Sequence, residues 1–132
     1  MPTGTAPRYS SPYAHTLGVE WVNDGARNVL HMPYGKHLIG RPSFLHGGAL
    51  AGMVELAAWF TLTEALSGKP GTVFKPISIS VDFLRGGKMV ETHAAATITR
   101  LGRRLAIVES WAWQEDEASP NVRAGLKFLI VR

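Results

Sequence analysis

Residues 44–66 read FLHGGALAGMVELAAWFTLTEAL, and they form the longest apolar segment of the chain. Glu55 is its only formally charged side chain before Glu64. Good helix formers dominate after Gly48, and the stretch is far longer than a typical strand, so it predicts a helix over about 46–66. A helix that is apolar on every side is covered by protein or lies in a membrane. An unpaired carboxylate there costs several kcal/mol, so Glu55 is predicted to have local partners or a chemical role.

Composition and spacing argue against metal and membrane proteins. The chain has no cysteine, which excludes disulfides and thiolate metal sites, and its five histidines show no metal-ligand spacing. A membrane span over residues 44–63 would place Glu55 near its middle, at a cost of about 2.5–3.5 kcal/mol. Residues 1–11 lack the apolar region of a signal peptide. We therefore expect a cytoplasmic protein with no metal, no cofactor and no membrane partner.

The basic residues are concentrated in one segment. The net charge of the chain is +4, and residues 85–104 carry five basic side chains against Glu91 alone, which equals this excess. A local patch of this kind suits a phosphorylated ligand better than a long nucleic-acid track, so nucleic acid is not expected as a partner. The five residues are Arg85, Lys88, Arg100, Arg103 and Arg104.

The chain before the helix predicts an arm and a hairpin. Residues 1–14 contain three prolines among small polar residues and are expected to form a flexible arm, so that a single domain spans residues 15–132. Apolar residues alternate over 17–21 and 28–32, on either side of Asn23-Asp24-Gly25. An Asp-Gly pair tolerates the positive φ of a tight turn, so this region is predicted to be a hairpin.

Four strands are predicted after the helix. Residues 77–83 alternate cleanly between apolar and polar side chains, residues 89–100 alternate more weakly, and residues 122–130 form the last strand. Short connections between them predict an antiparallel meander. In the third strand, residues 104–113, the larger apolar side chains share one face, which is expected to face the core: Leu105, Ile107, Trp111 and Trp113.

One long apolar helix with five or six strands, four of them after it, defines an α+β domain. A helix with no polar face needs a curved sheet around it and a second cover on its remaining side. A second copy of the chain is the simplest supplier of that cover.

The helix start resembles a known family. His46-Gly47-Gly48, followed after six residues by Glu55-Leu56-Ala57, is similar to the motif HGG-x6-[DE]-x-A of hotdog-fold acyl-CoA thioesterases of the phenylacetate-degradation (PaaI-like) type. Residues 80–85 resemble the strand that follows the helix in this family, and residues 100–106 resemble its basic hairpin turn. The resemblance covers roughly residues 15–132. It implies a hotdog fold, in which one long central helix is wrapped by a curved antiparallel sheet of five to six strands.

The resemblance implies a hydrolase for small or aromatic acyl-CoA thioesters, with coenzyme A as part of the substrate. Glu55 would be the general base or nucleophile, and the Gly47 N–H would hold the thioester carbonyl. A glycine amide at a helix N-terminus suits a developing oxyanion, because it combines close approach with the helix dipole. The two residues lie about 12 Å apart along one helix, at a rise of 1.5 Å per residue. A shared site therefore needs Gly47 from one subunit and Glu55 from its partner, in a dimer or a dimer of dimers.

Two interpretations stay open for the other residues of the predicted site. His46 acts as a catalytic base or caps the helix, and Gly48 contacts substrate or serves only the helix-entry turn. Trp59 lines an acyl pocket or belongs to the helix core. The basic side chains hold the phosphates of coenzyme A or form a solvated hairpin tip: Arg85, Arg100, Arg103 and Arg104.

The chain departs from the family pattern at two positions. Family members commonly have an asparagine six residues before the histidine, where this chain has Gly40, and some have a serine or threonine where Pro76 lies. These departures favour one alternative, a non-catalytic acyl-CoA binding module. The other alternative is a hotdog enoyl-CoA hydratase or dehydratase, since those enzymes resemble the layout from Gly40 to Glu55.

Overall fold

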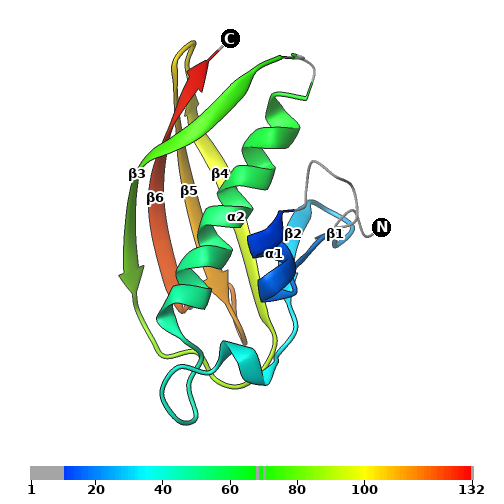
Figure 1. Cartoon of the computed structure of the whole chain (residues 1–132), viewed down its shortest axis with the longest axis vertical. Helices are drawn as coiled ribbons and strands as arrows, with labels where there is room; N and C mark the ends of the chain where they lie inside the picture. Colours follow the sequence, from blue (N-terminus) through cyan, green and yellow to red (C-terminus); the bar gives the residue numbers. More distant parts are fainter. Residues whose placement is uncertain (1–10, 68, 70, 132) are drawn as a thin grey trace.

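Helix α2 (Gly47–Ala65) lies diagonally across one face of a six-stranded antiparallel sheet (Figure 1). The computed structural model describes residues 11–67, 69 and 71–131. This arrangement confirms the predicted α+β architecture of one long helix with four strands after it. The other elements are α1 (Pro12–Leu17), β1 (Glu20–Asn23), β2 (Asn28–Met32), η2 (Lys36–Leu38), β3 (Val73–Phe83), β4 (Thr92–Leu101), β5 (Leu105–Trp113) and β6 (Val122–Val131).

Helix α2 forms where the sequence predicts it, and it supplies most of the core. Its buried side chains lie all around the helix except along one stripe, and they pack against β2, β4, β5 and β6. No helix in the described ranges is long and apolar enough to cross a membrane. Between Gly48 and Trp59 the exposed or half-buried residues of α2 lie on one side of the helix, and we call them the open stripe: Gly48, Ala51, Glu55 and Trp59.

The order of the strands corrects the predicted meander. The sheet runs β1-β2-β4-β5-β6-β3, so β4, β5 and β6 form a meander, whereas β3 pairs with β6 at the far edge. Residues 84–91 therefore cross below the start of α2 instead of forming a hairpin (Figure 1). The Leu84 N–H donates to the Asn121 carbonyl, and the Gly87 carbonyl accepts from the Leu45 N–H. Alternation within a strand carries no information about its neighbour, so the sequence alone did not reveal this crossing.

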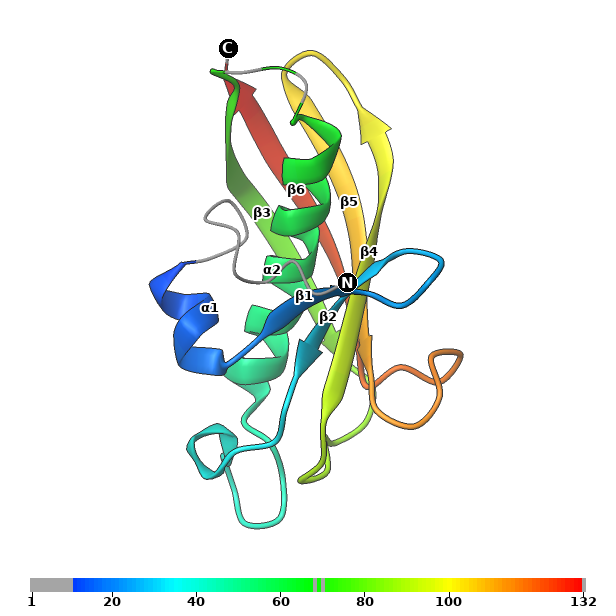
Figure 2. The ribbon, with the colours of Figure 1, turned by 90° about the vertical axis from the view of Figure 1, so that its right-hand side faces the viewer.

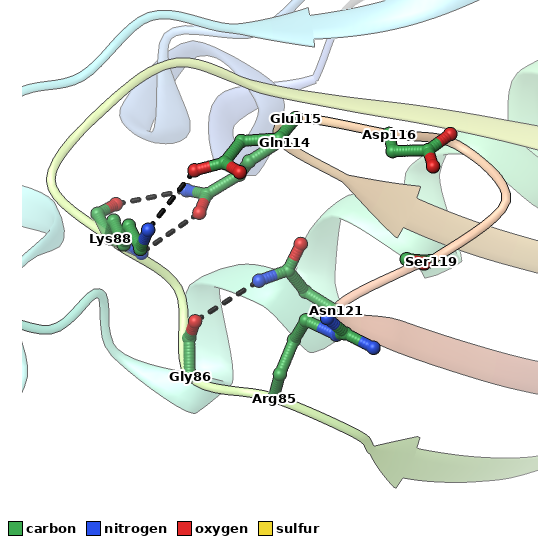
Figure 3. Close-up of a pocket in the computed structure, with 8 residues that line it drawn as sticks. All are labelled: Arg85, Gly86, Lys88, Gln114, Glu115, Asp116, Ser119 and Asn121. Atoms are coloured by element: carbon green, nitrogen blue, oxygen red, sulfur yellow. Dashed lines mark hydrogen bonds and ion pairs between the residues drawn. The ribbon is translucent and has the colours of Figure 1, made fainter.

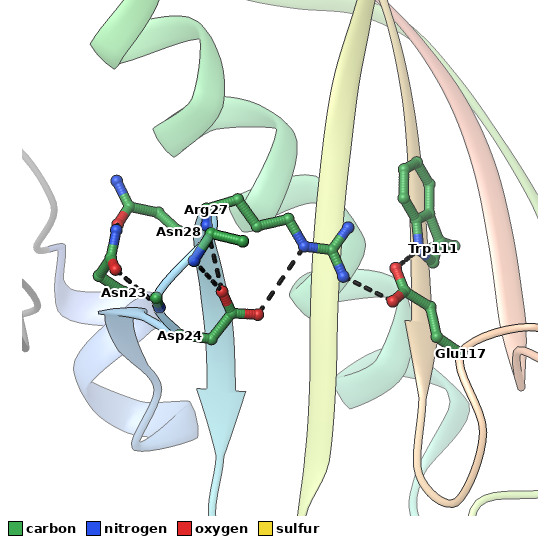
Figure 4. Close-up of polar contacts among 8 residues, drawn as sticks. Asn23, Asp24, Arg27, Asn28, Trp111 and Glu117 are labelled. Atoms are coloured by element: carbon green, nitrogen blue, oxygen red, sulfur yellow. Dashed lines mark hydrogen bonds and ion pairs between the residues drawn. The ribbon is translucent and has the colours of Figure 1, made fainter.

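The face of β5 was predicted wrongly. The side chains that face α2 are the small ones, including Ala106, Val108 and Ala112, whereas Trp111 and Trp113 lie on the outer face and are half-buried. The Trp111 Nε1–H donates to Glu117 at 2.8 Å, and Glu117 also pairs with Arg27 from the β1–β2 turn (Figure 4). The helix lies close to β5, so its inner face has room only for small side chains. Size was therefore a misleading guide to burial.

The N-terminal segment is corrected in part. Residues 12–14 were assigned to a flexible arm, but helix α1 begins at Pro12, with the Ser11 side chain as its N-cap. Ala14 is only 3% exposed and belongs to the core, and α1 packs against α2 (Figure 2). A proline at the first helical position after a serine cap is a helix-start signal that the composition argument overlooked. Residues 1–10 of the predicted arm lie outside the described residues.

The predicted hairpin before the central helix is confirmed by the pairing of β1 with β2. In its turn, Asp24 Oδ1 accepts hydrogen bonds from the Ala26 and Arg27 amides, and Gly25 has a φ of 101°. The glycine supplies the positive φ that the turn requires. Only its beginning differs, because Leu17 belongs to α1 and not to the first strand.

Candidate active site

The start of α2 presents a backbone amide that has no hydrogen-bond partner in the described part of the chain. His46 is the N-cap residue, and its Nδ1 accepts a hydrogen bond of 2.8 Å from the Gly48 N–H. The amides of Ala49 and Leu50 donate to the His46 carbonyl. The Gly47 N–H is left without a partner among those residues. Such an amide carries the positive end of the helix dipole and is suited to bind an anionic oxygen.

The cap contact assigns a structural role to His46. A ring nitrogen that accepts a backbone N–H carries no proton of its own, so the proton of the neutral ring is on Nε2. To act as a base through Nδ1, His46 would have to give up the bond to Gly48. The predicted role of His46 as a helix cap is confirmed, and its role in catalysis stays a prediction.

A cavity of about 290 Å³ opens beside the Gly47 amide. Arg41, Phe44, Phe83 and Arg85 contribute to its wall. A Cβ atom at Gly47 would lie 3.4 Å from the Phe83 ring, so glycine keeps the approach to the amide open. The sequence identified Gly47 and Arg85 as site residues. It missed Phe83, although that residue lies within the strand motif, because its side chain was read only as part of an alternating pattern.

Glu55 lies on the open stripe, near the middle of α2, and is half-buried. No hydrogen bond or ion pair joins it to any residue among 11–67, 69 and 71–131. Hydrogen bonds from backbone amides to the Glu55 carboxylate were the alternative to a chemical role, and none is found within this part of the protomer. Glu55 and the Gly47 amide are eight positions apart, or about 12 Å along the helix axis. They do not form one site within a single protomer.

The side chain of Tyr13, which the sequence analysis did not single out, lies over the same face of α2. Its hydroxyl donates to the Gly48 carbonyl at 3.3 Å. Its ring lies so close to Gly52 that a Cβ atom there would be 2.2 Å from the hydroxyl oxygen. Burial, and to a lesser degree the charge of Glu55, raises the pKa of Tyr13 above its ordinary value. A tyrosine in a segment taken for an arm gave no signal of this contact.

Trp59 connects the open stripe to the edge of the sheet. Its ring lies 4.6 Å from that of Phe74 on β3 and 6.3 Å from that of Phe128 on β6, measured between centroids. It is half-buried and one turn after Glu55. Its packing against these aromatic rings supports the interpretation as core, while its partly exposed edge faces the same side of α2 as Glu55.

The basic residues fall into two groups. Arg85 lies near the start of α2 and lines both the cavity at Gly47 and a larger one of about 480 Å³. The larger cavity holds a Lys88–Glu115 ion pair of 3.0 Å and a bond of 3.1 Å from Asn121 Nδ2 to the Gly86 carbonyl (Figure 3). It is mixed in charge, because Asp116 also lines it.

The second group occupies the β4–β5 turn, at the opposite end of α2 (Figure 1). Its arginines line shallow surface cavities, and none of them forms an ion pair within the described ranges. The predicted cluster is therefore not assembled within one protomer. The group consists of Arg100, Arg103 and Arg104.

The two departures from the family pattern have structural consequences. A Cβ atom at Gly40 would lie 2.9 Å from the His46 Cα, so the backbone leaves no room for a larger side chain there. Pro76 pairs with Phe128 next to a β-bulge in β3 and offers no polar group.

No group of three or more histidine, aspartate or glutamate side chains in the described residues is placed to hold a metal ion.

Comparisons with known proteins agree with this geometry. Residues 43–120 match the profile of the thioesterase superfamily, whereas the comparison with curated proteins gave no match. A thioesterase from Haemophilus influenzae is 22% identical, with a TM-score of 0.79 over 93% of this chain and 85% of that one. A Bacillus halodurans protein crystallised with CoA is 19% identical, with a TM-score of 0.80 over 94% and 78%.

A phenylacetic acid degradation-related protein from Ralstonia eutropha is 18% identical, with a TM-score of 0.77 over 91% of each chain. At these identities the similarity establishes the hotdog fold. The family profile covers more than half of the chain, and the chain therefore belongs to the thioesterase superfamily. Its enzyme class is thioesterase, as the helix-start motif predicted.

Proposed function

We propose that the protein hydrolyses a small or aromatic acyl-CoA thioester. The observation that carries this proposal is that two groups on α2 have no hydrogen-bond or ion-pair partner in the described part of the chain, the Gly47 amide at the helix start and the carboxylate of Glu55. Glu55 removes a proton from water, and the water oxygen attacks the thioester carbon. The Gly47 N–H holds the resulting oxyanion. The C–S bond then breaks, and the thiolate of coenzyme A takes the proton from Glu55.

A homodimer formed through the edge of β3 would complete the site. Strand β3 pairs with β6 on one side only, and two of its apolar side chains that face α2 are exposed, Ile79 at 42% and Phe83 at 57%. An open, apolar edge strand is a template for pairing with a second copy. Antiparallel pairing of two β3 strands brings the Phe83 end of one protomer beside the Val73 end of its partner. A dimer of dimers is equally compatible with this interface.

The same pairing would supply the phosphate-binding residues. The β4–β5 turn lies at the Val73 end of β3, so the turn of the partner would approach the Gly47 cavity. Its three arginines then join Arg85 around the entrance and hold the phosphates of coenzyme A through charge-assisted hydrogen bonds. The cytoplasmic location expected from the sequence is part of this proposal.

The first experiment measures thiol release from a panel of acyl-CoA substrates. We expect Glu55→Gln to lower kcat by about 100-fold or more, because general-base catalysis contributes at least that much. Glu109→Gln is the matched control, since Glu109 is exposed on β5. Equal turnover by the wild type and Glu55→Gln would overturn the proposal.

A second experiment tests whether two protomers share the site. Gly47→Pro removes the N–H, and proline is well tolerated at the first position of a helix. The preceding His46 has an extended conformation that suits a following proline. The Gly47→Pro and Glu55→Gln variants are then combined in equal amounts and refolded together. Half of the dimers would contain one protomer of each variant, and one of the two sites in such a dimer would be intact. Activity would therefore return to about a quarter of that of the wild type. No recovery would contradict a site shared between Gly47 of one protomer and Glu55 of its partner.

A non-catalytic acyl-CoA binding module is the second candidate. The crowded backbone at Gly40 and the apolar Pro76 favour it, because neither position offers a polar group to a water molecule. Tight binding of an acyl-CoA without release of thiol would decide for this candidate. A change in enoyl-CoA absorbance without thiol release would instead indicate a hydratase or dehydratase.

A further inference from the structure

A hydroxyl reaches the open stripe from outside the helix. Apart from Glu55, the stripe consists of small or apolar residues, and the Tyr13 hydroxyl enters it from α1. Tyr13 is 47% exposed, so its ring is open on one side while its hydroxyl is held against α2 at Gly48. Gly52 precedes Glu55 by three positions, which makes the two residues neighbours on the helix surface. The hydroxyl thus lies against Gly52, on the side of α2 from which Glu55 projects, and it is near enough for the charge of Glu55 to raise the pKa of Tyr13.

We propose that Tyr13 is a positioning residue of the hydrolytic site, whose hydroxyl oxygen holds the attacking water beside Glu55. The inference rests on the function proposed above, with Glu55 as general base. Because the hydroxyl donates its proton to the Gly48 carbonyl, its lone pairs are free to accept. One proton of the water is held by Tyr13 and the other is transferred to Glu55. A lone pair of the water oxygen is then directed to the thioester carbon.

Gly52 is the residue that makes this position possible. Its φ is not positive, so the backbone does not require glycine. In the middle of a helix, glycine is less favourable than alanine by about 0.5–1 kcal/mol. What it provides is space, because a Cβ atom would lie 2.7 Å from the Tyr13 ring and closer still to the hydroxyl oxygen.

The electrostatics agree with a neutral phenol. Burial and the charge of Glu55 both raise the pKa of Tyr13, so the hydroxyl keeps its proton at neutral pH. It can then donate to Gly48 and accept from water at the same time. Conversely, Glu55→Gln removes a negative charge and should lower the pKa of Tyr13.

The main test replaces only the hydroxyl. We expect Tyr13→Phe to lower kcat by about tenfold, the effect of one lost hydrogen bond, with unchanged KM. Its thermal stability should fall by no more than the loss of the bond to the Gly48 carbonyl explains, since the ring still packs on Gly52. Tyr34→Phe is the control, because the Tyr34 hydroxyl donates to the Met89 sulfur at 3.7 Å and forms no other hydrogen bond within the described residues. Gly52→Ala should reproduce the loss in kcat with the hydroxyl present, because it displaces the ring. In the double variant the two losses should not add.

A titration adds a readout that packing does not change. Tyrosinate absorbance in alkaline solution, with the Tyr13→Phe signal subtracted, reports the pKa of Tyr13 alone. A pKa that does not move in Glu55→Gln would contradict the proximity of the two groups and overturn the inference.

The kinetic outcomes separate this inference from the proposed function. If Glu55→Gln is inactive and Tyr13→Phe retains the kcat of the wild type, the positioning role is wrong and the hydrolase proposal stands. A Tyr13→Phe variant that raises KM at constant kcat would also overturn the role. If Glu55→Gln is fully active, the hydrolase proposal itself fails.

Discussion

Strands β3 and β6 lie side by side, and both carry apolar side chains on the face toward α2. In β6 these residues are buried, and Leu126 and Phe128 have no exposed surface. In β3 the residue opposite Leu126 is Ile79, which is 42% exposed. The difference comes from position, because β6 has a strand on each side and α2 above it, whereas β3 has one neighbour. A similar alternation of apolar side chains therefore forms part of the core in β6 and an exposed edge of the sheet in β3.

The largest expected effect contrasts two phenylalanines on this face. Phe128→Ala should lower the free energy of unfolding by about 3–5 kcal/mol, because it leaves a cavity between α2 and the sheet. Phe83→Ala should lower it by less than about 1 kcal/mol, since its ring is more than half exposed. Urea unfolding at a protein concentration low enough to keep the chain monomeric, followed by tryptophan fluorescence, measures both. Equal losses would mean that β3 is as buried in solution as β6, and the contrast would fail.

A charge on the open edge should affect assembly next most strongly. We expect Ile79→Lys to raise the dissociation constant of the dimer by about 100-fold, or about 2.7 kcal/mol, and to lower turnover with it. Analytical ultracentrifugation over a concentration series measures the first, and thiol release measures the second. Thr97→Lys puts the same charge on an exposed position of β4 and should leave both unchanged. A dimer that survives Ile79→Lys would exclude β3 as the interface.

Overpacking tests the cross-strand pair of Val81 and Ala124. Ala124 is buried in the core, so Ala124→Leu should cost about 1–3 kcal/mol of unfolding free energy. Val81 is half-buried at the edge, and Val81→Leu should change stability by less than about 0.5 kcal/mol. Thermal unfolding of the two variants at low protein concentration compares them directly. A cost at Val81 as large as that at Ala124 would show a tightly packed edge.

The smallest expected effect is the dependence of stability on pH. The β3 and β6 variants must therefore be compared at one pH. Glu91 bonds His31 at 2.8 Å and lies 3.7 Å from His93, outside both strands. Burial, then the charge of His31, lowers the pKa of His93, so the unfolded chain binds its proton more readily. Stability should therefore fall as pH drops below the ordinary value of 6.5. His93→Gln should flatten this dependence in urea titrations, and an unchanged slope would exclude His93 as its source.

Glu91 acts in the same direction at lower pH. The hydrogen bond from His31 lowers the pKa of Glu91, so its contribution is present above the ordinary value of 4.5 and is lost as pH falls through the lowered one. Glu91 is an exposed side chain, so solvent screens its interactions and the effect should be small.

Local patterns allowed much of the fold to be predicted. The apolar run with a His-Gly-Gly start gave α2 to within about one residue at each end, and alternation identified β4, β5 and β6. The helix-start motif nominated Gly47 and Glu55, because its spacing is a property of one helix, and their catalytic roles stay a prediction. The Ser11-Pro12 helix start was present in the sequence but was outweighed by composition.

The errors share a cause, which is that they concern distances between segments. The buried face of β5 depends on how closely α2 approaches, and only small residues such as Ala106 and Ala112 fit beneath it. The contact of Tyr13 with Gly48 and Gly52 spans α1 and α2. Neither relation has a period or a spacing that a sequence pattern can express.

Periodicity, capping and motif spacing act over a few residues, so they were sufficient to predict the helix, most of the strands and the superfamily, and to nominate Gly47 and Glu55 as candidate site residues. Only the packing in three dimensions establishes which edge β3 occupies, which face of β5 is buried and that the Tyr13 hydroxyl contacts the start of α2. These features follow from the packing of α2 against the sheet, where close contact selects one arrangement among several that the local patterns allow.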